Sequence, residues 1–351
     1  MRCESAILAP DLTPQLARRH CPSRDEERID ARSSDPTPGL LFYDGLSSDM
    51  RTLLLHNPTA GGAHPSADEL MEQLRAAGFS PRYQSTKDDS YREALNQDWD
   101  LVIVAGGDGT VTRVARGLRD RTTPIAILPI GTANNIARAL GLEGDVAGLI
   151  ARLGTAKPRR LDVGVAEGPW GKRRFLEAVG FGAIAKAISH SGPKPPKALR
   201  IDSGREELQT FLQDAEAERF EFSVDGERFA GDFLLLEVLN LKLTGPALPI
   251  LFAAAPDDGS LEIVFLMESE REQMTAWLKH PEDAPCPVHV RKGRKIAVEW
   301  RHSYARIDSR VYLPPKGINP VKIKLENDGL QVLVPESDPP PQASQPQQAA
   351  P

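Results

Sequence analysis

The sequence has few cysteines and no long apolar run, and both shortages exclude classes of protein. Three cysteines occur in 351 residues: Cys3, Cys21 and Cys286. They form no CxxC pair and cannot all be paired, so no disulfide framework is expected. The most apolar stretch, residues 232–256, is broken by Glu237 and Pro246, short of the roughly 20 apolar residues that span a bilayer. No secretory signal is visible either, so we predict a cytoplasmic protein without a stable transmembrane anchor.

A surplus of positive charge is also lacking. Lys and Arg total 43 against 49 Asp and Glu, which leaves a net charge of −6. Binding to nucleic acid requires basic residues that displace counterions, so no nucleic-acid partner is expected. Two common nucleotide motifs are missing as well. There is no GxxxxGK[ST] segment, and the GxGxxA form at residues 180–185 is followed too soon by the Pro/Lys segment 193–197 to open a long helix.

The chain changes its hydrophobic pattern once. Residues 50–163 alternate short apolar runs with helical segments, which predicts an α/β domain with a parallel sheet and right-handed crossovers. Strands are expected near 53–55, 82–86, 101–105 and 125–130, with helices near 66–77, 91–96, 111–118 and 133–140. The pattern of residues 164–335 predicts mostly β structure, and their last strands are candidates to return to the first domain.

The predicted second domain contains six strand-like runs and one helix. The runs are 174–179, 220–224, 232–239, 260–265, 295–300 and 321–325, with the helix at 205–218. The two ends of the chain differ from both domains. Residues 1–49 are rich in Pro, Ser, Asp and Arg and predict a disordered leader, or an upstream start that precedes a true start at Met50. Residues 336–351 form a Pro/Gln/Ala tail that is expected to be disordered.

Residues 101–110, Leu-Val-Ile-Val-Ala-Gly-Gly-Asp-Gly-Thr, join a predicted buried strand to a helix through a glycine-rich bend. Glycine allows the backbone to turn sharply and to approach a ligand closely. The helix start beyond the bend offers free N–H groups and a positive dipole end to a phosphate. Asp108 is the unusual member, because a carboxylate beside phosphates is repulsive unless a cation or a transferable proton lies between them. The segment therefore predicts a nucleotide-binding site that takes part in a reaction.

Two further bends follow the same logic. Residues 57–62 follow the first predicted strand, and residues 131–134 follow the fourth. The carboxyl ends of parallel strands meet at one edge of a sheet, where open α/β sheets bind ligands. Thr132 has two open roles: its hydroxyl caps the following helix or contacts a phosphate. Three such bends at one edge favour a ligand site over ordinary turns.

Taken in order, these segments resemble the diacylglycerol kinase catalytic family, and within it the bacterial lipid kinase branch related to sphingosine kinases. Four segments carry the resemblance: Asn57-Pro58-x-x-Gly61, Gly106-Gly107-Asp108-Gly109-Thr110, Gly131-Thr132-Ala133-Asn134 and Ala255-Pro256-Asp257-Asp258-Gly259. It spans about residues 51–335. The resemblance implies an ATP- and Mg²⁺-dependent kinase of a hydroxyl on a diacylglycerol-like lipid. It also implies that ATP binds in a cleft between the α/β domain and a β-sandwich domain.

The resemblance assigns roles to individual residues. It implies nucleotide contacts at Asn57, Thr59, Thr86, Gly106, Gly107, Asp108, Gly109, Thr110, Arg113, Gly131, Thr132 and Asn134. Asp108 is expected to act through the metal and phosphates or to assist proton removal. A magnesium site is implied at the Asp258 carboxylate, flanked by the main-chain carbonyls of Ala255 and Ser260. Without the resemblance, the Asp-Asp-Gly segment would be interpreted as a hairpin turn.

Two positions depart from the family pattern. The family carries a Glu as general base where Arg310 stands, and a Glu where Arg113 stands. A guanidinium cannot accept a proton, because its pKa exceeds about 12. Asp308 and Asp108 are the nearby candidates to replace the base. Two alternatives to the lipid kinase therefore stay open: a catalytically silent relative that binds nucleotide or lipid, and a kinase of a soluble acceptor such as NAD.

A lipid acceptor implies contact with a membrane surface. Residues 247–252 are apolar and residues 291–295 are basic, which makes both candidates for peripheral docking. The competing interpretation is a core segment and a solvated basic turn, and it is the favoured one. The sequence leaves the oligomeric state open, a homodimer included.

Overall fold

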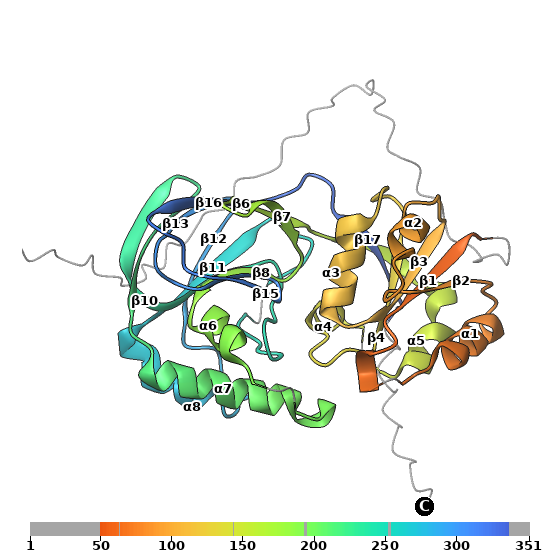
Figure 1. Ribbon diagram of the computed structural model, residues 1–351, viewed down its shortest axis with the longest axis horizontal. Helices are drawn as coiled ribbons and strands as arrows, with labels where there is room; N and C mark the ends of the chain where they lie inside the picture. The colour runs from red at the N-terminus through yellow and green to blue at the C-terminus, as the bar shows by residue number, and fades with distance from the viewer. Residues whose placement is uncertain (1–49, 63, 143, 193–194, 252–253, 337–351) are drawn as a thin grey trace, which may run out of the picture. The chain divides into compact units, whose positions relative to one another are not determined.

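The computed structural model describes residues 50–336 apart from 63, 143, 193–194 and 252–253 (Figure 1). All of these residues belong to one compact unit. The predicted leader 1–49 and the predicted tail beyond residue 336 lie outside the described residues. Two sheets organise the fold, one mostly parallel and one antiparallel. The predicted fold class, an α/β part followed by a mainly antiparallel β part, is confirmed.

The first sheet has six strands in the order β2-β1-β3-β4-β17-β5. Their bounds are β1 Thr52–His56, β2 Arg82–Ser85, β3 Leu101–Gly106, β4 Ile125–Pro129, β5 Lys157–Leu161 and β17 Leu330–Val334. The first four pair in parallel, and every residue of β3 is buried. β17 returns from the far end of the chain to lie between β4 and β5.

In the part of the chain that the structure describes, five helices accompany this sheet: α1 Ala67–Ala76, α2 Tyr91–Leu95, α3 Asp108–Gly117, α4 Asn135–Ala139 and α5 Val146–Ala151. Ser66 and Glu69 form a capping box at the start of α1. The sequence pattern missed α5, which is short and begins at the Asp145 cap. Leu53, Ile103 and Leu128 belong to the core between the sheet and its helices.

The second sheet is antiparallel and follows the strand order β15-β14-β8-β10-β9-β13-β16-β6-β7, with β11 and β12 branching from β10. Its strands are β6 Gly164–Gly168, β7 Gly171–Phe175, β8 Ala178–Gly182, β9 Glu218–Val224, β10 Glu227–Leu239, β11 Leu261–Met267, β12 His289–Gly293, β13 Lys295–Trp300, β14 Ala305–Ile307, β15 Arg310–Tyr312 and β16 Asn319–Leu325. Trp170, between β6 and β7, contacts Tyr312 of β15 with ring centroids 4.6 Å apart. The two ends of the strand order therefore meet, and the sheet curls around an aromatic core.

Helices in the second part differ from the prediction. Its described residues form three helices, α6 Ala183–His190, α7 Arg200–Asp214 and α8 Arg271–Trp277, where the pattern predicted one at 205–218. α7 begins five residues earlier than predicted, and β9 takes over at Glu218. The predicted strand 174–179 is interrupted at Leu176 and Glu177, because these two residues turn the chain from β7 to β8. Single turns of 3-10 helix lie at Ala60–Gly62, Leu153–Thr155, Lys197–Leu199 and Glu268–Glu270.

Candidate nucleotide site

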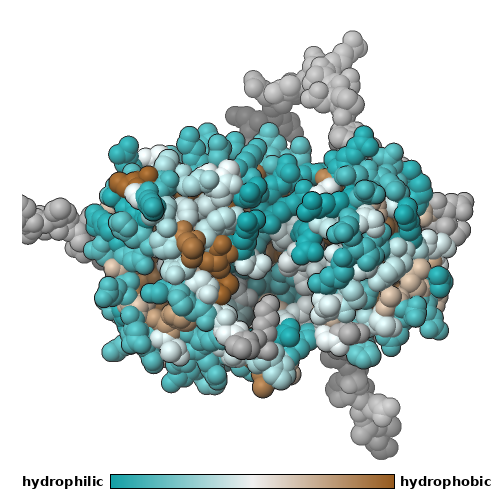
Figure 2. Space-filling view, viewed as in Figure 1, coloured by the Kyte–Doolittle hydropathy of each residue, from teal (hydrophilic) through white to brown (hydrophobic). Residues whose placement is uncertain are grey.

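A cavity of about 570 Å³ lies beside the carboxyl ends of β1, β3 and β4. Figure 2 looks onto a hollow between the α/β part and the β-rich part. The three glycine-rich bends form one side of the cavity, and residues from β14, α6 and α7 form the other. This edge is where the parallel sheet was expected to bind a ligand.

Two of the bends touch each other through glycine. A methyl group placed on Gly131 would lie 2.3 Å from the Gly107 Cα, and one placed on Gly107 would lie 2.9 Å from the Gly131 Cα. Neither position has room for a side chain. The close approach brings the start of α3 and the start of α4 to the same side of the cavity. Free N–H groups from both bends can therefore face one anionic ligand.

The third bend is fixed to the first by Asn57. Its side-chain amide donates to Thr110 Oγ1 at 3.3 Å, and its carbonyl oxygen accepts from Thr59 Oγ1 at 3.0 Å. Gly61 in the same bend has φ +68°, a conformation that favours glycine. A methyl group there would lie 2.9 Å from the carbonyl oxygen of Ile130. All three bends are thus joined by direct contacts.

Asp108 is the first residue of α3, and its carboxylate also holds the start of α4. The main-chain N–H of Ile136 donates to Asp108 Oδ1 at 2.9 Å. Burial, and then the negative charge of Glu177, raises the pKa of Asp108 from 3.8 to about 6. The raised pKa places this carboxyl group close to neutral pH, a property common among groups that exchange protons.

Thr132 does not cap α4, so that option for its hydroxyl is wrong. The helix begins at Asn135, and the residue before it, Asn134, is left-handed with φ 51°. Asn134 donates instead to the carbonyl oxygens of Pro129 and Gly131 and so stabilises the bend. Thr132 lines the cavity and makes no hydrogen bond to the part of the chain that the structure describes. Its hydroxyl is available to a ligand.

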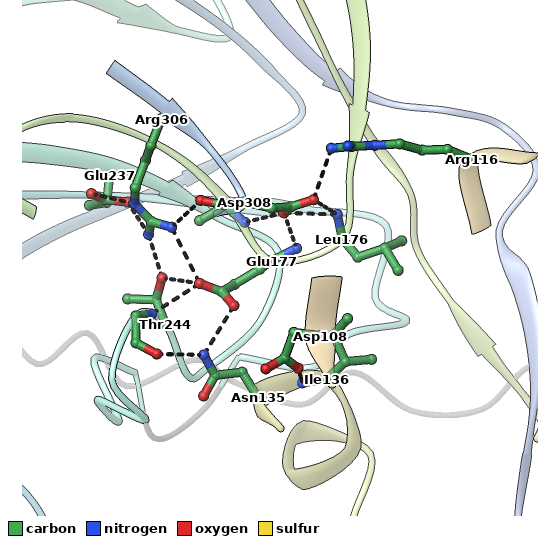
Figure 3. Close-up of polar contacts among 12 residues, drawn as sticks. Asp108, Arg116, Asn135, Ile136, Leu176, Glu177, Glu237, Thr244, Arg306 and Asp308 are labelled. Atoms are coloured by element: carbon green, nitrogen blue, oxygen red, sulfur yellow. Dashed lines mark hydrogen bonds and ion pairs between the residues drawn. The ribbon is translucent and has the colours of Figure 1, made fainter. Parts of the chain in front are cut away.

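A buried network of charged side chains lies at the cavity (Figure 3), and three of its members, Glu177, Arg306 and Asp308, line it. Arg306 of β14 is 1% exposed; its guanidinium donates to Glu237 at 2.7 Å and to Glu177 at 3.3 Å, and it also contacts the hydroxyl of Thr244. Glu177 Oε1 accepts from Thr244 at 2.8 Å, and its Oε2 accepts from Asn135 at 3.0 Å. The network links the antiparallel sheet to the start of α4.

Asp308 belongs to the same network. Main-chain N–H groups of Leu176, Glu177 and Ala178 donate to its Oδ1 at 2.9–3.3 Å, and Arg116 of α3 donates to its Oδ2 at 3.1 Å. Burial first, and then the charge of Glu177, raises the pKa of Asp308 to about 6. With three main-chain donors and a guanidinium around it, Asp308 holds the β7–β8 turn in place.

The cavity brings together most of the residues singled out for the nucleotide. Its lining includes Asn57, Thr59, Gly107, Asp108, Gly109, Thr110, Arg113, Gly131 and Thr132. Gly106 and Asn134 lie directly behind the bends, in contact with Thr110 and Gly131. Thr86 is buried after β2, where its N–H donates to His56, and it does not line the cavity.

Arg310 and Arg113 differ in their positions. Arg113 lines the cavity and has no ion pair within the described ranges. Arg310 is exposed on β15, with its guanidinium carbon 5.4 Å from the centre of the Tyr312 ring, and it is not a lining residue. Ser309, one residue earlier, does line the cavity. The position of the expected base is thus filled by a side chain that lies along the surface of the strand.

Asp258 lies outside the cavity, and a lysine holds it. Lys292 Nζ is 2.6 Å from Asp258 Oδ2, and the N–H of Ser260 donates to Asp258 Oδ1 at 3.0 Å. Among the described residues, no group of three or more His, Cys, Asp or Glu side chains is placed to hold a metal ion. The ammonium of Lys292 thus occupies the carboxylate oxygen at which a Mg²⁺ ion was expected, and the site at Ala255, Asp258 and Ser260 stays a prediction.

The two segments considered for membrane docking are not alike. Ala247, Leu248 and Ile250 are buried, so the apolar segment is core up to that point; Phe252 lies outside the described residues. In the basic segment, Arg291 and Lys292 belong to strand β12, Lys295 begins β13, and Arg294 lies in the bend between the two strands. No helix within residues 50–336, the undescribed positions aside, has the length and apolar character needed to cross a membrane.

The sequence did not identify the buried charged network, of which Glu177 and Arg306 line the cavity. Glu177, Glu237 and Arg306 are far apart in the chain and meet only because β8, β10 and β14 are neighbours. One signal was available: Glu177 and Glu237 each stand alone within an apolar run. A single charge within such a run indicates a buried ion pair or a functional group.

A cavity between an α/β part and an antiparallel sheet, with glycine bends and an acid at its edge, is typical of a nucleotide-dependent phosphotransferase. The model of the diacylglycerol kinase catalytic domain matches residues 51–166. The chain is 30% identical over 230 residues to a protein of Pseudomonas aeruginosa named "Probable lipid kinase YegS-like", covering 63% of this chain and 73% of that protein. It belongs to the bacterial diacylglycerol kinase catalytic family, a family of kinases.

Two other comparisons agree with this assignment. The diacylglycerol kinase of Bacillus subtilis is 25% identical over 234 residues, which cover 62% of this chain and 74% of that enzyme. A solved structure of a diacylglycerol kinase from Bacillus anthracis aligns with 81% of this chain and 96% of its own, with a TM-score of 0.58 and 21% identity. At this identity the structural likeness shows the fold.

Proposed function

We propose that the protein transfers the γ-phosphoryl group of ATP to a hydroxyl of a diacylglycerol-like lipid. One observation carries the proposal: three glycine-rich bends and Asp108 surround one cavity. Membership of the kinase family supports ATP as the phosphoryl donor. Main-chain N–H groups at the start of α3 and in the bend 131–134, together with the hydroxyls of Thr59 and Thr132, are suited to the phosphates.

Charge at the cavity supports the same assignment. Arg113 offers a guanidinium without an ion-pair partner in the described part of the chain, and guanidinium groups bind phosphate oxygens with two parallel hydrogen bonds. Asp108 is the residue that would face a Mg²⁺ ion carried by ATP. When bound, that ion neutralises charge on the phosphates during transfer. The Asp108 carboxylate would otherwise repel them.

The other half of the cavity is suited to an apolar acceptor. Its apolar lining includes Ile184, Ala187 and Ile188 of α6, Leu208 of α7, and Pro246, beside the polar Ser191, Arg200 and Glu207. Apolar side chains of this kind bind acyl chains through burial of surface, worth about 25 cal/mol per Å². A lipid with its chains against α6 and α7 would direct its hydroxyl towards the bends. Contact with a membrane surface follows from a lipid acceptor.

The chemistry is compatible with the loss of the family's base. Phosphoryl transfer proceeds through a loose transition state and depends mainly on positioning and on charge stabilisation. A general base contributes about 10²–10⁴-fold. Asp108 lines the cavity beside the bends, and its carboxylate can accept a proton from the hydroxyl. We assign it that role in addition to its place beside the phosphates.

Arg310 supports a second candidate function, in which the protein binds nucleotide but transfers no phosphoryl group. Because Arg310 lies on the surface of β15, we expect Arg310→Glu to change turnover by less than about threefold and the unfolding temperature by about 1 °C or less. Steady-state kinetics and thermal unfolding check both values. A tenfold gain in turnover would show that an acid at this position reaches the acceptor and that its loss weakens the enzyme.

The direct test is incubation of purified protein with γ-labelled ATP, Mg²⁺, a panel of lipid extracts, pure diacylglycerol and NAD. We expect label in a lipid that runs as a phosphatidic acid or a close relative on thin-layer plates. Label in NAD would replace the lipid proposal with a soluble acceptor. Absence of transfer, together with ATP binding measured by calorimetry, would favour the silent relative.

A further inference from the structure

We propose that the ammonium of Lys292 replaces a divalent cation at the Asp257-Asp258-Gly259 turn, so that the turn keeps its shape without bound metal. Lys292 Nζ lies 2.6 Å from Asp258 Oδ2 and 3.2 Å from Glu262 Oε1. One positive charge therefore bridges two carboxylates, as a bound cation would. The inference concerns the turn alone and is independent of which acceptor the enzyme phosphorylates.

Strand register places the lysine at the turn. β11 and β12 pair in antiparallel fashion, with Glu262 directly opposite Lys292. Directly opposed residues have their side chains on the same face of a sheet, about 5 Å apart. Asp258 lies four residues before Glu262, in the turn that leads into β11. The ammonium reaches both acids from a position that the backbone fixes.

The contacts leave the Asp258 carboxylate with both oxygens engaged. Ser260 N–H donates to Oδ1 at 3.0 Å, and Lys292 holds Oδ2. A divalent cation at Oδ2 would have to displace the ammonium, and like charges at this distance repel. Glu262 is buried, so the lysine also compensates an acid that would otherwise be unpaired in a position of low solvent access.

The turn connects to the segment that joins the two sheets. Gly259 N–H donates to Asp162 Oδ2 at 2.8 Å, and Asp162 N–H donates to the carbonyl oxygen of Pro256 at 2.7 Å. Asp162 is buried and lies between β5 of the first sheet and β6 of the second. The ammonium consequently stabilises the connection between the two sheets, and its removal should lower the unfolding temperature.

Thermal unfolding without ATP tests the replacement. We expect wild-type protein to unfold within about 1 °C of the same temperature in EDTA, MgCl₂ and CaCl₂. Lys292→Met leaves Asp258 and Glu262 as facing carboxylates, so its unfolding temperature in EDTA should fall by roughly 2–4 °C. About 10 mM CaCl₂ or MgCl₂ should restore most of that loss, since a cation then takes the place of the ammonium.

Two further variants make the comparison specific. Lys295→Met removes an exposed lysine without a carboxylate partner in the described residues, and it should respond to cations as the wild type does. Lys292→Met/Asp258→Asn should lose the cation response of the single variant. A wild-type unfolding temperature that falls in EDTA and rises with Mg²⁺ as much as that of Lys292→Met would overturn the proposal.

Metal analysis of the wild-type protein gives a result even where Lys292→Met fails to fold. After dialysis against buffer that contains MgCl₂ and CaCl₂ and then desalting, we expect well under one divalent ion per chain. One tightly held ion per chain, lost together with stability on chelation, would contradict the assignment. Since no ATP is present in either assay, failure here is distinguishable from failure of the proposed kinase activity.

Discussion

At the scale of single residues, the contact between Gly107 and Gly131 determines whether the site can form. The Cα of each glycine occupies the space that a side chain on the other would need. This requirement is visible in the sequence, because glycine at the end of a buried strand usually marks a sharp turn or a close approach of the backbone. The floor of the cavity is different: Glu177 and Arg306 are 129 residues apart, and no local pattern relates them.

Gly131→Ala and Gly109→Ala separate a structural glycine from one that faces the ligand. A methyl group on Gly131 would lie 2.3 Å from the Gly107 Cα, whereas on Gly109 its nearest neighbour within 4 Å is Ser309 Oγ at 4.0 Å. We expect Gly131→Ala to lose about 2–4 kcal/mol of stability through overpacking. Gly109→Ala should fold normally and weaken ATP binding by tenfold or so, about 1.4 kcal/mol. Denaturant titration and calorimetry measure the two effects; equal stability of both variants would disprove the close contact.

Asp108→Asn tests the acid at the edge of the cavity. The side chain keeps an oxygen for the N–H of Ile136 and loses its charge, so turnover should fall by at least about 100-fold. The kcat/KM of the wild type, which reports the free enzyme, should decline as the pH falls through about 6, the raised pKa of Asp108, because the carboxylate is then protonated. Turnover that is unchanged in Asp108→Asn would remove Asp108 from the mechanism.

The same substitution should alter the pH dependence of stability. The folded pKa of Asp108 lies above its ordinary value of 3.8, so folding favours the protonated acid. That contribution is complete below pH 3.8 and is lost as the pH rises through about 6. Asp108→Asn should therefore unfold at a higher temperature than the wild type at pH 8, and the difference should vanish near pH 4. A lower unfolding temperature at pH 8 would contradict the raised pKa.

At the scale of elements, the strongly patterned strands and helices were predictable and the short or interrupted ones were not. The parallel strands β1, β3 and β4 are apolar runs bounded by glycine or proline, and all three appear where expected. The run 174–179 is uniform in sequence but breaks at Leu176–Glu177, since Asp308 accepts three N–H groups of this turn. A distant side chain creates that break, so it cannot be predicted from the local sequence.

The pairing of β14 with its neighbours depends on Arg306. Arg306→Met leaves Glu237 and Glu177 buried without their cation, so we expect a loss of about 3–5 kcal/mol in the free energy of unfolding. Arg306→Met/Glu237→Leu should recover part of this loss, because only Glu177 then lacks a partner charge. Arg301→Met, which removes the partly exposed partner of Glu221 and Glu299, should cost about 1 kcal/mol or less. Chemical denaturation compares the three variants; equal losses for Arg306→Met and Arg301→Met would contradict the importance of the buried network.

At the scale of the whole molecule, the sequence predicts the order of the two parts but not how they connect. The change of pattern near residue 163 marks the passage from one sheet to the other at Asp162. The contact of Trp170 with Tyr312, which joins the ends of the curled sheet, and the position of β17 between β4 and β5 are products of tertiary pairing. The cavity forms only because these connections hold the second sheet against the glycine bends.

The central claim is that three glycine bends and Asp108 together bind the triphosphate of ATP. The measurement that tests it most directly is a crystal structure of the protein with Mg²⁺ and a non-hydrolysable ATP analogue. The account predicts phosphate oxygens about 3 Å from main-chain nitrogens at the start of α3 and in the bend 131–134, with the γ-phosphate facing the apolar lining of α6 and α7. A nucleotide bound elsewhere, or bends that separate when it binds, would contradict the account.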